Sequence, residues 1–362
     1  MAENESRKHS AYMQWAKTQH ARYNAASSGV QFYPLKDLNV RIEDIEISGP
    51  SNYGGYEPLH KALANKCAVD PECVAVATGT SMANHLVMAA MLNTGDEILI
   101  EHPTYDPILA VARYLGAKIK RFQRTHENQF VIEPDEIRKQ LTPETKLIVI
   151  TDLHNPSGVF VGDKILKKVG TLAKEVGAKV LVDEVYRECL YTEPGLPVSV
   201  FHLGNEFIST NSLTKAYGLN GLRCGWVLAE PELIRKVLLL NDLYGVIPAH
   251  SAERLSVIAL EQLPQIAARA KSLLDENRQH LNRFFDENVE FLDVVKPKYG
   301  TIAFPKLKKG DASEFCARVL KEYETLIVPG SFFEMSDHFR VGIGGNTADL
   351  VEGLSRISRA LK

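Results

Sequence analysis

The segment 211–226 carries the most specific chemistry in the sequence. Lys215 ends the run SLTK (212–215), and Arg223 follows eight positions later. A nearby guanidinium would help the Lys215 amine lose its proton, and a neutral amine can attack an aldehyde to form an imine. An isolated lysine is more often an ordinary surface charge. The chemistry therefore depends on what the rest of the chain places beside Lys215.

Two groups of polar residues directly follow apolar runs and are suited to a charged ligand. Thr80 and Ser81, in the run TGTS, could hold a phosphate at the positive end of a helix, although Thr and Ser more often simply cap a helix. Asp183 ends the apolar run KVLVD, where a carboxylate is costly unless a cation pairs with it. Tyr186, three residues later, could present its hydroxyl to the same place. The ordinary alternative for Asp183 is a salt bridge or a helix cap.

Two more residues stand just after apolar runs. Tyr105, in HPTY, could stack on a planar ring, and core packing is its ordinary alternative. Asn155, in NPSG, offers both a hydrogen-bond donor and an acceptor, and turn formation is its ordinary alternative.

These polar residues lie at the ends of short apolar runs, which alternate along the chain with amphipathic runs. Continuous apolar runs such as KLIVIT and KVLVD are typical of strands buried on both faces, which favours a mostly parallel sheet covered by helices. Sites in such sheets lie at the carboxyl ends of the strands. The pattern predicts strands over 74–77, 97–101, 118–122, 147–151, 179–183 and 207–210, and helices over 82–92, 107–115, 134–140 and 163–176.

The last third of the chain has a different character. From about Leu273 a long helix leads into short mixed strands, and a terminal helix is predicted over 347–361. This predicts a smaller α+β domain, joined by the N-terminal segment. That segment, with Trp15 and Tyr33, could close over a substrate or simply pack on the small domain.

Six motifs occur in a familiar order: TGTS, HPTY, NPSG, DEVY, SLTK with Arg223, and FRVG. Together they resemble the fold-type I pyridoxal-phosphate enzymes, in particular the class I/II aminotransferase family, from about Tyr53 to the C-terminus. The resemblance implies an α/β architecture with a large domain over 48–270, built on a mostly parallel seven-stranded sheet with helices on both faces. Residues 1–47 and 271–362 would form the small discontinuous α+β domain.

The resemblance also implies roles for single residues. Lys215 resembles the lysine that holds pyridoxal 5'-phosphate as an internal aldimine and then moves a substrate proton. Asp183 would pair with the pyridinium nitrogen, while Tyr186 and Asn155 would bind the phenolic oxygen. Arg340, in FRVG, matches the residue that binds the substrate's α-carboxylate, with help from Asn155; an exposed strand-end charge is its alternative. Tyr105 would stack on the ring, and the phosphate ligands would be Thr80, Ser81, Ser212 and Arg223.

Two positions depart from the family pattern. Pro50 stands where the family places a tyrosine that reaches the phosphate of the neighbouring subunit, so this role falls to Tyr53. A shared site of this kind implies a homodimer. Asn241 stands where aspartate aminotransferases carry the arginine for a distal carboxylate, which disfavours a dedicated aspartate enzyme.

Length and composition set wider bounds. A chain of 362 residues with 45% hydrophobic and 24% charged residues is an ordinary globular protein of two domains or one large unit. A net charge of −3 gives no general positive field for nucleic acid or an anionic membrane. The five cysteines form no C-x-x-C pair and do not suggest a disulfide framework. The sequence has no signal-peptide pattern and no apolar run long enough to cross a membrane, so we expect a cytoplasmic protein. We expect no metal site.

We therefore expect an aminotransferase that moves an amino group between an amino acid and a 2-oxo acid by a ping-pong route. The same residues would serve a lyase, a decarboxylase or a cyclase acting on an amino acid. A non-catalytic ligand sensor is the remote alternative, disfavoured because the residues before Tyr53 are too few for a DNA-binding domain.

Overall fold

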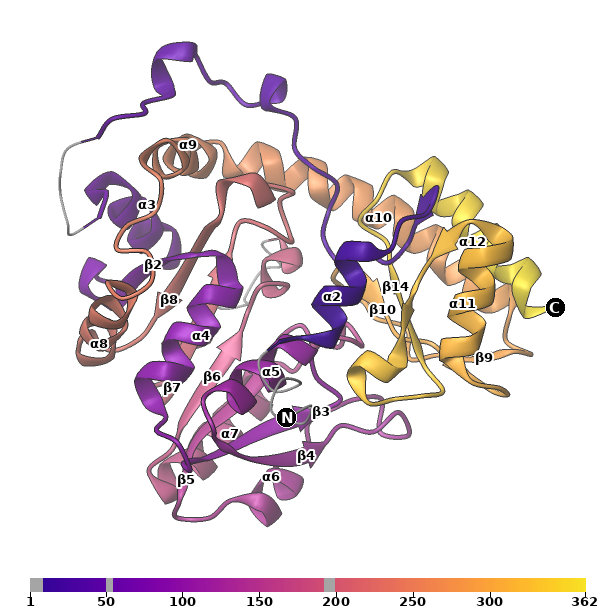
Figure 1. Ribbon diagram of the computed structural model, residues 1–362, viewed down its shortest axis with the longest axis horizontal. Helices are drawn as coiled ribbons and strands as arrows, with labels where there is room; N and C mark the ends of the chain where they lie inside the picture. The colour runs from indigo at the N-terminus through magenta and orange to yellow at the C-terminus, as the bar shows by residue number, and fades with distance from the viewer. Residues whose placement is uncertain (1–8, 50–54, 192–198) are drawn as a thin grey trace.

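A seven-stranded sheet forms the centre of the molecule (Figure 1). The computed structural model describes residues 9–49, 55–191 and 199–362. The strand order is β2-β8-β7-β6-β5-β3-β4, and only β8 runs antiparallel to its neighbours within this sheet. The strands are β2 (Val74–Thr78), β3 (Glu97–His102), β4 (Lys118–Gln123), β5 (Thr145–Thr151), β6 (Lys179–Asp183), β7 (Phe207–Ser212) and β8 (Cys224–Leu228).

Alternating side chains of the apolar strands enter two separate cores. Val149 and Leu181 face one side, where they pack with α4 (Gly79–Met91), α5 (Asp106–Tyr114) and α8 (Pro231–Asn241). Ile148 and Val180 face the other side, against α6 (Pro134–Gln140) and α7 (Asp163–Val176). Burial on both faces explains the continuous apolar runs. The predicted mostly parallel sheet with helices on both faces is confirmed.

The C-terminal part packs three helices against short strands. These helices are α10 (Leu263–Glu287), α11 (Ala312–Tyr323) and α12 (Thr347–Leu361). Strands β10 (Ile302–Ala303), β14 (Phe339–Gly342) and β13 (Val328–Pro329) form a three-stranded antiparallel sheet, and β9 (Leu292–Asp293) pairs with β11 (Lys306–Leu307). The division at 47/48 and 270/271 stays a prediction, and the second position falls inside α10.

The N-terminal segment runs between these two parts of the molecule. It begins with α2 (Ala11–Thr18), and β1 (Tyr23–Asn24) then pairs in parallel with β12 (Thr325–Leu326). Beyond β1, the Val30 amide donates to the Lys215 carbonyl at 2.8 Å, and the Gln31 amide donates to the Gly344 carbonyl at 2.7 Å. The segment is therefore bonded to the sheet-bearing part and to the C-terminal part.

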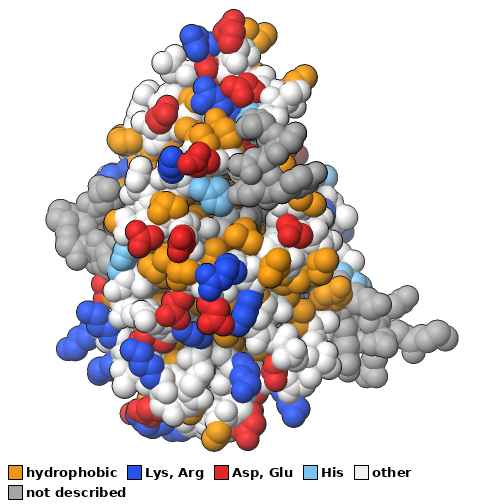
Figure 2. Space-filling view, turned by 90° about the vertical axis from the view of Figure 1, so that its left-hand side faces the viewer, with side chains coloured by type: hydrophobic (Ala, Val, Ile, Leu, Met, Phe, Trp, Pro, Cys, Tyr) orange, Lys and Arg blue, Asp and Glu red, His pale blue; other side chains and the backbone are white. Residues whose placement is uncertain are grey.

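One side of the molecule leaves large apolar side chains in solvent. It includes α8, α3 (Glu57–Cys67) and α9 (His250–Glu261), and hydrophobic groups gather there among charged ones (Figure 2). Leu239 on α8 is 69% exposed, and Leu243 in the following turn is 78% exposed.

All five cysteines are unpaired. Among the helices of the described residues, none combines the length and the apolar character needed to cross a membrane.

Candidate active site

A cavity of about 210 Å³ opens at the carboxyl ends of the central strands. Nine of the eleven predicted site residues line it: Thr80, Ser81, Tyr105, Asn155, Asp183, Tyr186, Ser212, Lys215 and Arg223. Arg340 reaches it through a hydrogen bond to Asn155, and Tyr53 lies outside the described residues.

The strand register explains why these side chains meet. Thr151 and Asp183 are opposite each other at the last pair of β5 and β6, and Asp183 pairs with Thr210 of β7. Because the three strands are parallel, their carboxyl ends lie at one edge of the sheet. The residues that follow each strand are therefore delivered to one place.

The start of α4 is suited to an anion. Thr78 is the N-cap residue but makes no side-chain capping bond, and the buried Thr80 hydroxyl has no hydrogen-bond partner among the described residues. Arg223 Nη2 donates to the Thr78 carbonyl at 3.2 Å. Gly79 has φ +78°, and a Cβ there would lie 2.4 Å from Arg223 Nη2. An unpaired hydroxyl, a guanidinium and the end of a 13-residue helix make a cradle for a phosphate.

Asp183 is held by amides. Asn84 Nδ2 donates to Asp183 Oδ2 at 2.7 Å, and the Val185 backbone amide donates to Oδ1 at 3.1 Å. The Thr210 hydroxyl donates to Asn84 Oδ1 at 2.5 Å, which fixes the amide orientation. Burial raises the pKa of Asp183, and the Asn84 hydrogen bond opposes that shift. A buried cation was expected beside Asp183, but no ion pair joins it to another of the described residues; Lys215 is the positive group that lowers its pKa.

Lys215 has an amine that can lose its proton near neutral pH. Burial, then the positive charge of Arg340, and more weakly that of Arg223, lower its pKa to about 8, while Asp183 opposes the shift. Its Nζ donates to the Ser28 hydroxyl at 2.9 Å. The effect of Arg223 predicted from spacing is present, but burial and Arg340 are the larger causes.

Arg340 is buried, which excludes an exposed strand-end charge. Its Nη1 donates to Asn155 Oδ1 at 2.9 Å, and its Nη2 donates to the Tyr12 hydroxyl at 2.7 Å and more weakly to the Ala26 carbonyl. Its Nε has no partner among the described residues. An unpaired donor on a buried guanidinium is available to a carboxylate.

Two tyrosines and a threonine complete the walls. Burial raises the pKa of Tyr186 and of Tyr105, so both hydroxyls stay protonated at neutral pH. The Asn155 backbone amide donates to the Thr151 hydroxyl at 2.9 Å, and that hydroxyl donates to the buried Glu101 carboxylate at 2.5 Å. These two hydrogen bonds hold the backbone of Asn155 in place beside the cavity.

The sequence pattern of the family described as "Aminotransferase class I and II" matches residues 41–357. The chain belongs to this family. Capreomycidine synthase of Streptomyces vinaceus is 27% identical over 94% of this chain and 90% of its own length. An aspartate aminotransferase of Streptomyces avermitilis is 26% identical over 92% and 88%. This class I/II aminotransferase fold also matches a PLP-dependent aminotransferase structure from Streptococcus suis, with a TM-score of 0.89, 27% identity and 96% coverage of each chain.

Pyridoxal 5'-phosphate is the cofactor of this class I/II family member, and the site fits it. The unpaired Thr80 hydroxyl beside Arg223 fits a phosphate, the Asp183 carboxylate fits a protonated ring nitrogen, and the Lys215 amine fits an aldehyde.

Several functional candidates of this family member were absent from the sequence interpretation. Asn84 binds Asp183, Ser28 binds Lys215, Tyr12 binds Arg340, and Met13 lines the cavity; these side chains come from elements distant in the sequence. Thr151 lies four residues before Asn155 and accepts a hydrogen bond from its backbone amide. Of these residues, only Asn84 had a signal in the sequence that could have indicated it: it is a polar residue on the apolar face of α4.

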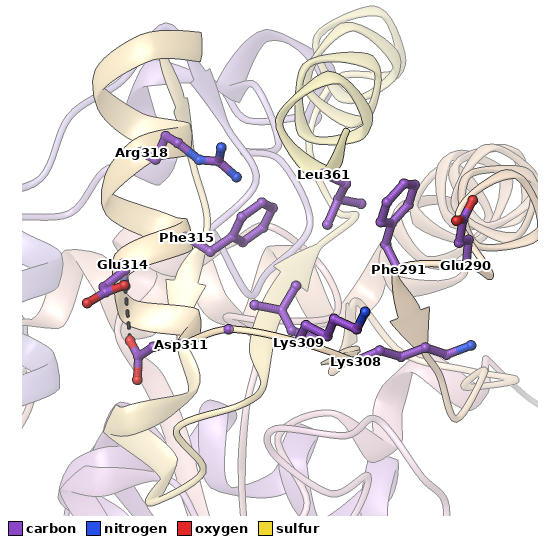
Figure 3. A pocket seen from close by; sticks show the side chains of 11 residues that line it. Glu290, Phe291, Lys308, Lys309, Asp311, Glu314, Phe315, Arg318 and Leu361 are labelled. Atoms are coloured by element: carbon purple, nitrogen blue, oxygen red, sulfur yellow. Dashed lines mark hydrogen bonds between the residues drawn. The ribbon is translucent and has the colours of Figure 1, made fainter.

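A larger hollow of about 610 Å³ lies in the C-terminal part (Figure 3). Phe291, Phe315 and Leu361 face it, with charged groups of both signs around them. Lys308 is already bonded to the Val289 carbonyl, and Arg318 to the Ala360 carbonyl. None of the predicted site residues lines this hollow.

Proposed function

We propose that this family member is an aminotransferase that moves an amino group between an amino acid and a 2-oxo acid by a ping-pong route. The observation that carries the proposal is that a readily deprotonated lysine and a buried arginine with an unpaired donor meet at one cavity. Lys215 has a pKa of about 8, and Arg340 is bonded to Asn155 in the cavity wall. An amine with a pKa of about 8 is suited to general acid–base work close to neutral pH.

The chemistry supplied by bound pyridoxal phosphate is a carbon that links to an amine and a ring that accepts an electron pair. Asp183, whose ionised form is stabilised by the Asn84 hydrogen bond, would keep a proton on the ring nitrogen. Tyr186 and Asn155 donate hydrogen bonds to the phenolic oxygen. With the cofactor bound, the Lys215 amine would remove the substrate's α-proton and would deliver it to the cofactor carbon that carries the amino nitrogen. Arg340 and Asn155 hold the α-carboxylate so that this proton points toward Lys215.

The phosphate ligands in this proposal are Thr80, Ser81, Ser212 and Arg223, and Tyr105 stacks on the ring. Ser212 is buried at the end of β7, and its hydroxyl accepts from the Thr214 amide at 3.3 Å, which leaves its proton for a phosphate. Tyr105 lies directly before α5 and faces the cavity.

The active protein in this proposal is a cytoplasmic homodimer in which Tyr53 reaches the phosphate of the partner subunit. The exposed Leu239 and Leu243 support an interface on this side, because apolar groups of that size gain from burial. Leu239→Glu with Leu243→Glu should convert a dimer to a less active monomer in sedimentation at micromolar concentration. Val289→Glu, at an exposed valine elsewhere, is the control. A fully active wild-type monomer would contradict the proposal.

Cyclisation of an amino acid is the second candidate. It is supported by the likeness to a structure described as a PLP-dependent cyclase, OrfR, which covers 96% of this chain. The same Lys215, Asp183 and Arg340 would serve, because the two reactions begin with the same loss of a proton.

One experiment separates these candidates. The cofactor-loaded protein is mixed with single amino acids while the cofactor absorbance is followed. An aminotransferase converts the cofactor to its aminated form, releases a 2-oxo acid, and recovers its first spectrum when a second 2-oxo acid is added. A cyclase, a lyase or a decarboxylase keeps the starting spectrum while consuming its substrate. Lack of a spectral response to every amino donor, with no 2-oxo acid formed, would contradict transamination.

A further inference from the structure

The donors of Arg340 are unevenly occupied. The Tyr12 hydroxyl lies 2.7 Å from Nη2, whereas the adjacent Nε has no partner among the described residues. A guanidinium presents Nε and Nη2 side by side, in the geometry that suits two acceptor oxygens. The phenol therefore fills one of two neighbouring acceptor positions. Its own proton remains available to a second acceptor.

Tyr12 is placed there by a docked helix. The Tyr12 amide donates to Asp106 Oδ2 at 3.2 Å, and the Ser10 hydroxyl donates to the same oxygen. Asp106 begins α5, directly after Tyr105, so the first turn of α2 is tied to the cavity wall. On the other side, Trp15 packs against Phe332 with ring centroids 5.2 Å apart. Helix α2 is thus anchored on two sides with Tyr12 facing Arg340.

The next residue of α2 reaches the cavity itself. Met13 lines it, and its sulfur accepts a hydrogen bond from the Tyr105 hydroxyl at 3.5 Å. Among the described residues that line the cavity, the charged ones are Asp183, Lys215 and Arg223. The proposed chemistry already uses all three: Asp183 for the ring nitrogen, Lys215 for proton transfer and Arg223 for the phosphate. A charged group at the far end of a substrate side chain would find no counter-charge there, and Met13 offers it an apolar contact.

We propose that Tyr12 and Met13 are substrate-binding residues and that the substrate is an amino acid with an uncharged side chain. One carboxylate oxygen accepts from Arg340 Nε and from the Tyr12 hydroxyl, and the side chain lies against the Met13 thioether. This inference rests on the proposed assignment of Arg340 to the α-carboxylate.

The test uses carboxylates that lack an α-amine, because they bind without reacting. Pentanoate, glutarate and 5-aminopentanoate share five carbons and differ only at the far end, and acetate lacks the chain. Their affinities for the cofactor-loaded protein are measured by calorimetry. We expect pentanoate to bind more tightly than glutarate or 5-aminopentanoate. Tyr12→Phe should weaken pentanoate binding about 10-fold or more, as expected for loss of a hydrogen bond to a charged group.

Three further variants make the result specific. Met13→Ala should weaken pentanoate but not acetate, and Ser10→Ala, which loosens the Asp106 anchor, should weaken both. Tyr23→Phe, at a tyrosine of β1 that packs against Arg356, is the matched control and should bind like the wild type. Unaltered cofactor absorbance in each variant shows that the fold is retained.

Wild-type affinity in Tyr12→Phe, tighter binding of glutarate or 5-aminopentanoate, or failure of the wild type to bind pentanoate would each overturn the proposal. Because no step of this assay needs turnover, its failure is distinct from failure of the proposed transamination. That reaction is judged by the response of the cofactor spectrum to amino acids.

Discussion

Asn84 on α4 donates a 2.7 Å hydrogen bond to Asp183 at the end of β6, and the two residues are 99 positions apart. Burial alone would favour the protonated carboxyl, and the Asn84 amide stabilises the ionised one. The strength of the Asp183 carboxylate as a partner for the ring nitrogen therefore depends on a neighbour in another element.

Asn84→Leu removes that donor and should raise the pKa of Asp183 further. We expect cofactor affinity to fall about 10-fold, measured by equilibrium dialysis, since the ring nitrogen then meets a weaker anion. Thr210→Val frees the Asn84 amide to turn and should give a smaller loss, whereas Thr210→Ser, which keeps the hydroxyl, should not. Equal cofactor affinity in Asn84→Leu and wild type would refute this role.

Lys215 should titrate near pH 8 in the protein without cofactor. The rate of imine formation with pyridoxal should rise with pH through this value, because only the neutral amine attacks. Arg340→Gln removes a positive charge that lowers the pKa of Lys215, so the profile should move to higher pH. Arg138→Gln, on the exposed surface of α6, is the control. A profile that stays in place, or moves to lower pH, would show that Arg340 does not act on this amine.

Lys215→Ala should bind the cofactor through the phosphate cradle yet lose the proton-transfer group. The expected fall in kcat is at least about 100-fold, the lower range for loss of a general base. Lys164→Ala on α7 serves as the control for removing a lysine. Unchanged turnover in Lys215→Ala would remove the catalytic assignment.

Gly79→Ala should displace Arg223 from the phosphate cradle. Gly177 provides a matched control, because its φ of +73° is close to the +78° of Gly79 while a Cβ there meets nothing within 4 Å. Both variants bear similar backbone strain. Only Gly79→Ala should lose the preference for pyridoxal phosphate over pyridoxal, compared by titration of the two ligands. If Gly177→Ala loses it equally, strain and not the clash with Arg223 is the cause.

The sheet and most of the cavity lining could be predicted from the sequence because both depend on local signals. Apolar runs mark the buried strands, and polar residues directly after them must lie at the carboxyl edge. Strand β8 was not predicted, because the run CGWVL directly follows Arg223 and was interpreted only as part of the lysine motif. Its antiparallel pairing with β7 and β2 depends on long-range contacts that no local pattern encodes.

The partners that adjust the site were beyond sequence reasoning. Ser28 meets Lys215 across 187 positions, and Tyr12 meets Arg340 across 328. Serine and tyrosine have too many ordinary uses for their type alone to indicate a site. The open alternative for the N-terminal segment is resolved in part, since the segment packs on the C-terminal part and also contacts Lys215 and Arg340.

The contact between Tyr12 and Arg340 also bears on the order of events during synthesis. Helix α2 leaves the ribosome first, but its partner in the site is among the last residues made. A nascent chain can form the sheet and the phosphate cradle while its first helix still has nothing to dock against on the C-terminal side. Premature termination between β8 and β14 would therefore yield a chain that contains the residues of the phosphate cradle but lacks the arginine that α2 contacts.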